Sequence, residues 1–311
     1  MTNNFSPFSL KPEAEPAYQK WRAWKLSVYP KTVDELLVQI KNPFDLNKEE
    51  KSKISQCFIR ANMAVYSINN VTDFTDKKIV ESLGLEFGLN RLDNNLGADS
   101  DSITSLQVID GGRKQGYIPY SNLKLSWHTD GYYNLPEEQI RGIILHCVTT
   151  AAEGGENALL DHEMMYIHLR DLNPAYISAL MKQDVLTIPA NIENGVEIRG
   201  AQSGPVFSVD EETGALHMRY SARKRNIIWS DDDVTTAAVK EIDNFLASDS
   251  AWIFHYRLQP GQGLICNNLL HNRTSFENDK NGKYQRLIYR GRYYDRLTGT
   301  SFNDIAKAMS S

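Results

Sequence analysis

Apolar residues in the first hundred positions recur mainly at the three- and four-residue spacing of amphipathic helices. Trp21 and Trp24 predict a short helix that packs onto the body of the protein. The same spacing predicts three further helices, at Lys31–Ile40, Asn47–Ala64 and Thr75–Leu85, and the apolar run Met63–Ile68 predicts a strand. The amino-terminal third is therefore expected to be largely helical.

Beyond residue 103 the pattern changes to short apolar or alternating runs separated by turn residues, which is typical of β-strands. We predict strands at Ile103–Val108, Leu123–Trp127, Ile140–Val148, Asn157–Leu160 and Arg286–Tyr294, and a hairpin-like unit of Trp252–Leu258 and Leu264–His271 around Pro260–Gly263. Residues 161–250 predict a mixed insert: helices over His162–Arg170 with Asp161 as N-cap, over Ala175–Lys182 and after Ser230–Asp233, with several strands in 184–229.

Many short strands with helices before and between them favour a double-stranded β-helix, or jelly-roll. The predicted class is α+β, mainly β. No internal repeat or low-complexity linker occurs, so 1–311 is predicted to be a single domain. Residues 1–100 would form a helical N-terminal decoration, and residues 103–296 the jelly-roll core that carries the insert.

The composition of the 311 residues, with 41% hydrophobic and 23% charged side chains, is that of an ordinary soluble globular protein. The net charge of -5 argues against nucleic acid as a partner, because phosphate binding needs clustered positive charge. The basic run Arg219–Arg225 is then expected to be a solvated face or a rim for anionic ligands.

Three widely spaced cysteines, Cys57, Cys147 and Cys266, match no metal-binding pattern and indicate a reducing compartment. The amino terminus lacks the basic and apolar regions of a secretory signal. No apolar run reaches the about 18 residues needed to span a bilayer. We therefore expect a cytoplasmic protein with no membrane partner.

The candidate chemistry lies in the segment Trp127–Gly131, which reads WHTDG, and in His271 far downstream. Side chains alternate faces along a strand, so His128 and Asp130 point to the same side while Thr129 points away. A second histidine brought across a sheet completes three ligands on one face of a metal. This 2-His-1-carboxylate set, His128, Asp130 and His271, is typical of non-haem Fe(II) oxygenases.

Two arginines beyond His271 lie four residues apart on the predicted closing strand. Arg286 and Arg290 should face the same side by alternation, and Arg292 shares that face. Guanidinium groups bind carboxylates bidentately and keep their charge, which suits a dicarboxylate co-substrate.

These segments resemble the Fe(II)/2-oxoglutarate-dependent dioxygenases of the taurine dioxygenase and γ-butyrobetaine hydroxylase superfamily. The resemblance covers residues 120–296 and rests on WHTD at 127–130, LHC at 145–147 with EGGEN at 153–157, and NNLLHNR at 267–273 with Gln285, Arg286 and Arg290. It implies the same jelly-roll fold, with Fe(II) as cofactor, 2-oxoglutarate as co-substrate and O2 as oxidant. The implied reaction oxidises a C–H bond of a small molecule and releases succinate and CO2.

The resemblance also implies roles for residues around the metal. Arg286 would hold the distal carboxylate of 2-oxoglutarate, and Arg290 would meet an anionic group of the substrate, with Arg292 able to take one of these roles. Asn157 stands where the taurine enzyme has a threonine, and its amide N–H can donate the same hydrogen bond to the co-substrate. The substrate is expected to be small, polar and anionic or zwitterionic. A homo-oligomer, dimer or tetramer, is compatible with the family.

Four tyrosines, Tyr117, Tyr120, Tyr132 and Tyr133, flank the ligand strand. Such rings can form a cage for a quaternary ammonium, so Tyr120 and Tyr132 are candidate substrate contacts. The other histidines are expected to be structural. His162-Glu163 is followed by His168, which is too distant for the HExxH motif of zinc proteases. The rest are expected to pack or to form hydrogen bonds: His146, His217 and His255.

Two other classes stay open from the residues alone. A zinc protein could use the same three ligands, and a non-catalytic jelly-roll protein could bind a small ligand in the same place. Intact ligands followed by an arginine pair argue against the non-catalytic protein, whereas metal analysis with an O2-consumption assay would separate the zinc protein from the oxygenase.

Overall fold

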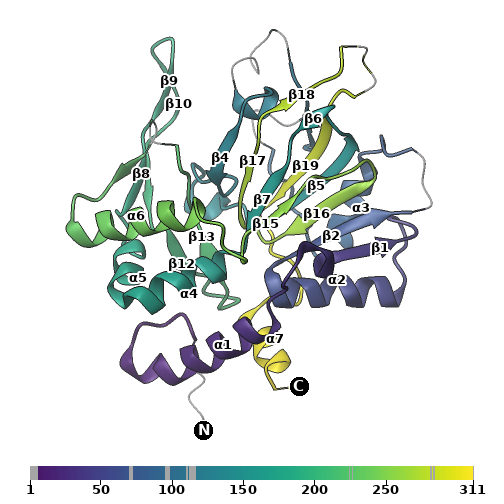
Figure 1. The fold of residues 1–311 in the computed structure, drawn as a ribbon. Helices are drawn as coiled ribbons and strands as arrows, with labels where there is room; N and C mark the ends of the chain where they lie inside the picture. Colours follow the sequence, from purple (N-terminus) through teal and green to yellow (C-terminus); the bar gives the residue numbers. More distant parts are fainter. Residues whose placement is uncertain are drawn as a thin grey trace.

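Two β-sheets make up the core of the protein (Figure 1), and the computed structural model describes residues 6–69, 73–94, 99–109, 111, 117–223, 225, 227–280, 282 and 284–310. The six-stranded sheet has the order β1 (Leu37–Ile40), β2 (Met63–Ile68), β16 (Gln262–Cys266), β5 (Gly142–Thr149), β19 (Leu287–Tyr293) and β3 (Thr104–Leu106). The four-stranded sheet has the order β15 (Phe254–Tyr256), β7 (Asn157–Leu160), β17 (Leu270–Arg273) and β4 (Leu125–His128). Together they form the jelly-roll that the sequence predicted.

Strand β19 shows how one sheet serves both packing and chemistry. On one face, Tyr289 donates a hydrogen bond to the carbonyl of Thr75, just before α3 (Lys78–Glu86). Tyr293 on the same face donates to the carbonyl of Val80, within that helix. On the other face, Arg290 and Arg292 are buried toward the interior of the barrel. Period-two alternation therefore separates a structural face from a charged one.

Helices cover the six-stranded sheet on its outer face. Helix α2 (Lys48–Ala61) packs against β1 and β2, and α3 packs against β5 and β19 (Figure 1). Helix α2 begins with a capping box, in which the Asn47 side chain and the Glu50 side chain satisfy each other's backbone N–H groups. It ends at Asn62, which adopts the left-handed conformation that closes a helix.

The insert forms a second helical layer beside the four-stranded sheet (Figure 1). Helices α4 (His162–Leu172), α5 (Pro174–Leu180) and α6 (Asp233–Leu246) pack on one another. The predicted N-cap Asp161 is confirmed, since it accepts a hydrogen bond from the Glu163 backbone. Short strands complete the insert: β8 (Leu186–Ile188), β9 (Asn191–Glu193), β10 (Val196–Arg199), β11 (Gln202–Gly204), β12 (Phe207–Val209), β13 (Leu216–Met218) and β14 (Ile228–Trp229).

The N-terminal helix α1 (Glu15–Val28) is joined to the insert by buried charges. Lys25 is fully buried, and its Nζ lies 2.7 Å from Asp161 Oδ2 and 2.5 Å from Glu163 Oε2. Trp21 is also fully buried, as predicted, and packs against Phe8 with ring centroids 4.9 Å apart. Further elements of the described residues are α7 (Phe302–Ala308), β6 (Glu153–Gly154), β18 (Phe276–Glu277) and short 3-10 helices at Pro12–Ala14, Val33–Leu36, Ile118–Tyr120 and Pro136–Glu138.

Two predicted elements are wrong. The predicted helix Lys31–Ile40 is a short 3-10 turn followed by strand β1, which pairs parallel with β2. Leu36, Val38 and Ile40 are buried in alternation, so a period of two also fits this run, and pairing with β2 decides between the two.

The second error is the hairpin-like unit. Strand β15 pairs with β7 in the four-stranded sheet, whereas β16 pairs with β2 and β5 in the six-stranded sheet. The predicted single strand Leu264–His271 is also two strands, β16 and β17, in different sheets. The chain crosses between them at Asn267 and Asn268, and Asn268 has a φ of 45°. Apolar runs alone do not reveal such a crossing, because both of these strands are buried.

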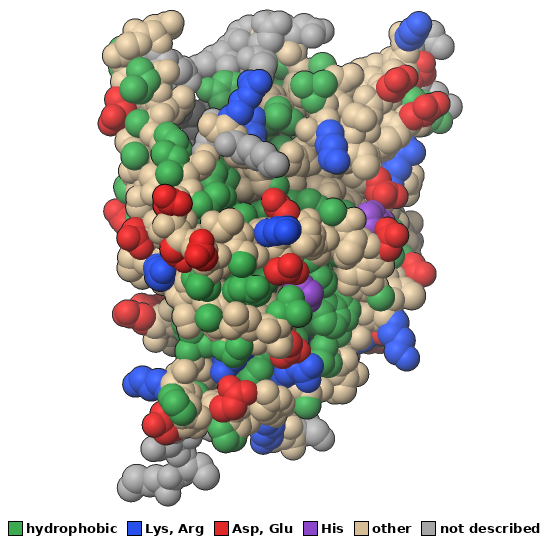
Figure 2. All heavy atoms as spheres, turned by 60° about the vertical axis from the view of Figure 1, so that its left-hand side comes forward, with side chains coloured by type: hydrophobic (Ala, Val, Ile, Leu, Met, Phe, Trp, Pro, Cys, Tyr) green, Lys and Arg blue, Asp and Glu red, His purple; other side chains and the backbone are tan. Residues whose placement is uncertain are grey.

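The surface carries no single-sign patch on the face shown in Figure 2, where acidic and basic side chains are interspersed. Arg219, the first residue of the basic run, is not on a solvated face, which was one of the two expectations for this run. It is buried, and its guanidinium donates to the carbonyls of Tyr132, Leu186 and Gln202. No helix among the described residues has the length and apolar character to cross a membrane.

Candidate active site

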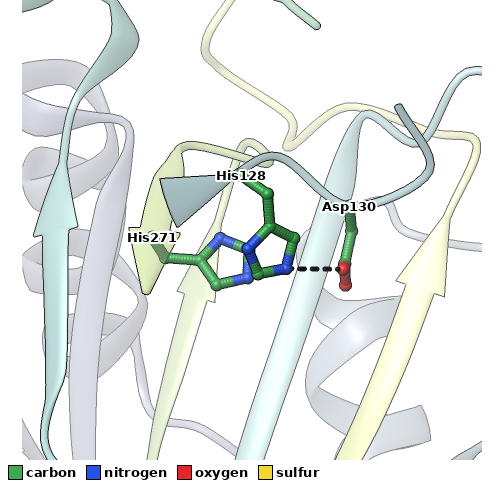
Figure 3. Close-up of side chains that lie close together, drawn as sticks. All are labelled: His128, Asp130 and His271. Carbon is green, nitrogen blue, oxygen red and sulfur yellow. Dashed lines mark ion pairs between the residues drawn. The ribbon is translucent and has the colours of Figure 1, made fainter. Parts of the chain in front are cut away.

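His128, Asp130 and His271 converge inside the barrel (Figure 3), and their ligand atoms all lie within 4.8 Å of one another. His128 ends β4, and its direct cross-strand partner in β17 is His271. This register places the two imidazoles side by side, with ring centroids 4.3 Å apart. Asp130 follows just beyond the strand, and its Oδ1 lies 3.5 Å from His128 Nε2.

Backbone carbonyls orient both imidazole rings. Nδ1 of His128 lies 2.8 Å from the Ser126 carbonyl, and Nδ1 of His271 lies 3.0 Å from the Leu269 carbonyl. A proton on Nδ1 leaves the lone pair on Nε2, which is the usual arrangement of a metal-binding histidine. Burial and the neighbouring His128 ring lower the pKa of His271 to about 4, so this ring is neutral near pH 7.

Asp130 supplies a negative charge to the same point. Burial alone would raise its pKa, but the nearby charge of the Arg290 guanidinium outweighs burial and holds the pKa well below its usual range. Nη1 of Arg290 lies 3.2 Å from each carboxylate oxygen. Two imidazole nitrogens and an ionised carboxylate are a donor set that suits Fe(II).

A tight turn sets the direction of Asp130. Thr129 Oγ1 accepts a hydrogen bond from the Tyr220 backbone and so points away from the ligands, as predicted. Gly131 has a φ of +66°, and a Cβ there would lie 2.4 Å from Ile140 Cγ1, so glycine is required. Asn268 holds the turn from the opposite side. Its Oδ1 accepts from the Asp130 N–H, and its Nδ2 donates to the carbonyls of Asp130 and Ile140.

Replacing Asn268 by alanine should weaken metal binding about ten-fold, because partners that orient a ligand typically affect metal affinity by 10–100-fold. The neighbouring Asn267 is a matched control. It is equally buried, but its side chain bonds to Asn62 and Thr300 instead of the ligand turn. Both alanine variants should unfold at lower temperature, and titration with Co(II) should separate them. Equal metal affinity of the two variants would show that Asn268 has only a structural part.

Strand β19 carries a second buried charged pair. Arg292 pairs with the carboxylate of Asp93 and donates to the Tyr133 hydroxyl at 3.0 Å. The Tyr294 hydroxyl donates to the same carboxylate at 2.8 Å. Since its guanidinium already has a carboxylate partner, Arg292 is a weaker candidate than Arg286 for binding 2-oxoglutarate. The sequence did not single out Asp93, because an isolated acidic residue after Arg91-Leu92 carries no motif.

Arg286 lies just before β19, where the pairing with β5 shifts register. Its guanidinium lies against the ring of Phe276, 5.1 Å from the centroid, and its Nη1 is buried with no hydrogen-bond partner. Arg273 lies against the same ring, 4.8 Å from the centroid, and was not among the predicted site residues. Alternation from His271 could have found it, because residues 271 and 273 share a face of β17.

Three further residues were predicted to contact the co-substrate or the substrate. Asn157 is buried in β7, and its Nδ2 donates to the Asn272 carbonyl at 2.8 Å. Tyr120 is buried and Tyr132 is half-buried, with its ring 5.2 Å from that of Tyr133. Tyr133 already lies near two guanidinium groups, of Arg199 and Arg292. The predicted contacts of Asn157, Tyr120 and Tyr132 with ligands stay predictions.

The histidines outside the triad have structural contacts. His146 bonds to the Tyr66 hydroxyl and the Phe74 carbonyl, and His162 to the Leu216 carbonyl. His217 is buried, which agrees with the prediction. His255 differs, since its side chain is 60% exposed and lies 3.4 Å from Glu156.

Comparisons with known proteins agree with this geometry. The chain matches the model of the taurine catabolism dioxygenase TauD, TfdA family over residues 30–291. Asparagine oxygenase, solved with Fe(II), 2S,3S-3-hydroxyasparagine and succinate, has a TM-score of 0.57 at 14% identity, over 85% of this chain and 94% of that one.

Two further solved structures have the same fold. A taurine dioxygenase from Burkholderia xenovorans has a TM-score of 0.55 at 14% identity, over 85% of this chain and 89% of that one. The non-heme iron oxygenase OrfP, solved with Fe, succinate and (3R,4R)-dihydroxy-L-Arg, has a TM-score of 0.56 at 14% identity, over 80% and 81%.

The family model covers most of the chain and includes all three residues of the triad. A zinc protein or a non-catalytic binding protein is therefore not the better interpretation of these ligands. This chain belongs to the TauD/TfdA family of Fe(II)- and 2-oxoglutarate-dependent dioxygenases, with His128, Asp130 and His271 as its facial triad.

Proposed function

We propose that the enzyme hydroxylates a C–H bond of a small anionic or zwitterionic metabolite and releases succinate and CO2. When bound, Fe(II) and 2-oxoglutarate supply the oxidising power, and the protein positions and shields the reactants. The main support for the proposal is the contact of the buried Arg290 guanidinium with the Asp130 carboxylate. A bound metal would share the negative charge of the Asp130 carboxylate with Arg290. Because Nε of Arg290 also has no hydrogen-bond partner, this guanidinium can bind a further anionic group.

A buried carboxylate lies beside Arg292, the next inward-facing residue of β19 after Arg290. Asp93, held by Arg292 and the Tyr294 hydroxyl, is a buried carboxylate that could meet an ammonium group. A cavity of ≈ 150 Å³ lies behind the ligand turn, on the side of Thr129. Its lining includes neither His128 nor His271, so it is separate from the proposed substrate site. Free amino acids carry the charges that such a site would select.

Two relatives of the same fold support this substrate class. Asparagine oxygenase and OrfP were both solved with hydroxylated amino acids. For the co-substrate, Arg286 is the proposed partner of the distal carboxylate of 2-oxoglutarate, because its buried Nη1 has no partner in the protein. Asn157 is the proposed second donor, since only one of its two amide hydrogens is used by Asn272.

Succinate release tests the proposal. Purified anaerobically, loaded with Fe(II) and given 2-oxoglutarate, the protein should first show a weak visible charge-transfer band. Air and a panel of amino acids, betaines, sulfonates and neutral amides should then be added separately. We expect succinate well above the substrate-free rate only with anionic or zwitterionic compounds. Turnover of the neutral amides alone would contradict the proposed substrate class, whereas absence of the band would contradict the assigned co-substrate.

A further inference from the structure

Arg273 and Arg286 form a pair of neighbouring buried cations. Their side chains are 3% and 7% exposed, and both guanidinium groups lie against the ring of Phe276. Burial, followed by the nearby charge of Arg273, lowers the pKa of Arg286 to about 9. Both effects identify a place where positive charge is poorly solvated by its surroundings.

This pair lacks the carboxylate that the two buried arginines within β19 have. Arg290 pairs with Asp130, and Arg292 pairs with Asp93. Arg273, in contrast, donates to the carbonyls of Ser121 and Leu123 through Nη2. Nε of Arg273 and Nη1 of Arg286 are buried without a hydrogen-bond partner. Two buried like charges with unused donors are costly unless an anion binds them.

Gly155 lies beside the pair. It has a φ of +75°, and a Cβ there would be in ordinary van der Waals contact, 3.6 Å from both Arg286 Nε and Phe276 Cβ. Arg273 also belongs to the metal-binding strand, two residues after His271 on the same face of β17. The pair is therefore inside the barrel with the triad.

We propose that Arg273 is a second binding residue for 2-oxoglutarate, which shares the distal carboxylate with Arg286. This inference rests on the proposed co-substrate site and adds a residue to it. Arg273 also holds the carbonyls of residues 121 and 123, just before strand β4. Binding of the dicarboxylate would thus stabilise the segment that leads to His128.

The experiment must separate the charge of Arg273 from its structural hydrogen bonds. Mn(II)-loaded protein is titrated calorimetrically with 2-oxoglutarate and with 2-oxopentanoate, which has the same chain length but no distal carboxylate. Arg273→Gln removes the charge but keeps N–H donors for the two carbonyls, and Arg273→Lys keeps the charge. For Arg273→Gln, the Kd of 2-oxoglutarate should rise about ten-fold and that of 2-oxopentanoate less than about two-fold. Arg273→Lys should bind 2-oxoglutarate within about three-fold of the unsubstituted protein.

Several outcomes would overturn the inference. A structural role predicts that Arg273→Gln weakens both ligands equally, and an irrelevant charge predicts that Gln and Lys behave alike. The unsubstituted protein gives an independent measure that does not depend on how a variant folds. Two charged partners predict a preference for 2-oxoglutarate over 2-oxopentanoate of at least about a hundred-fold, and a preference below about ten-fold excludes the second partner. No binding of 2-oxoglutarate at all would instead reject the co-substrate site as a whole.

Discussion

Replacing Asp130, His128 or His271 by alanine should abolish turnover and the charge-transfer band. A site with two protein ligands holds Fe(II) poorly, and we expect binding at least about a hundred-fold weaker, because changes to outer partners alone cost 10–100-fold. Iron content after gel filtration measures the loss of Fe(II) binding, and succinate formation measures the loss of turnover. His255→Ala is the control, since this exposed histidine lies outside the triad and should leave both unchanged.

Asp130 should differ from the two histidines in one further way. Its removal leaves Arg290 buried without its carboxylate, and breaking a buried ion pair from one side costs about 3–5 kcal/mol. Asp130→Ala should therefore also lower the unfolding temperature, and more than His271→Ala does. Full activity of any of the three alanine variants would mean that the metal lies elsewhere.

The second large effect is expected at Arg286. Arg286→Ala removes the proposed partner of the distal carboxylate, and a hydrogen bond to a charged group contributes about 1.5–3 kcal/mol. The Kd of 2-oxoglutarate should then rise roughly ten- to a hundred-fold. Titration of the charge-transfer band in Fe(II)-saturated protein measures this without knowledge of the substrate.

Arg290→Ala is the matched comparison on the same strand. It should leave the affinity for 2-oxoglutarate nearly unchanged and weaken an anionic or zwitterionic substrate. Saturation with Fe(II) is needed, because Arg290 also contacts the ligand Asp130. If Arg290→Ala weakens 2-oxoglutarate more than Arg286→Ala does, the two proposed roles must be exchanged.

Two residues of the triad could be predicted from local sequence information, whereas His271, far downstream, was assigned through the family resemblance. His128 and Asp130 are two residues apart at a strand end, and strand geometry alone brings them to one side. The jelly-roll class followed from many short strands, and most strand positions were confirmed within a few residues. The Asp161 N-cap and the burial of Trp21 also followed from local rules.

The structural features that the sequence did not predict depend on contacts between distant segments. Lys31–Ile40 fits both a helical and an alternating pattern, and only the parallel pairing with β2 makes its last four residues a strand. The bonds of Asn268 to the Asp130 turn join residues 138 positions apart, and no motif marks them. Arg219 was expected at the surface, but backbone carbonyls of the insert and of Tyr132 surround it.

Helix α1 has a consequence for where the folding unit begins. The span shared with the family starts at residue 30, after α1 ends at Val28. Yet Lys25 in that helix is the fully buried counter-ion of Asp161 and Glu163, which belong to the N-terminus of α4. A polypeptide trimmed to the shared span would leave two carboxylates in the interior without their cation. The leading segment therefore contributes to the buried interior, although it lies outside the span shared with the family.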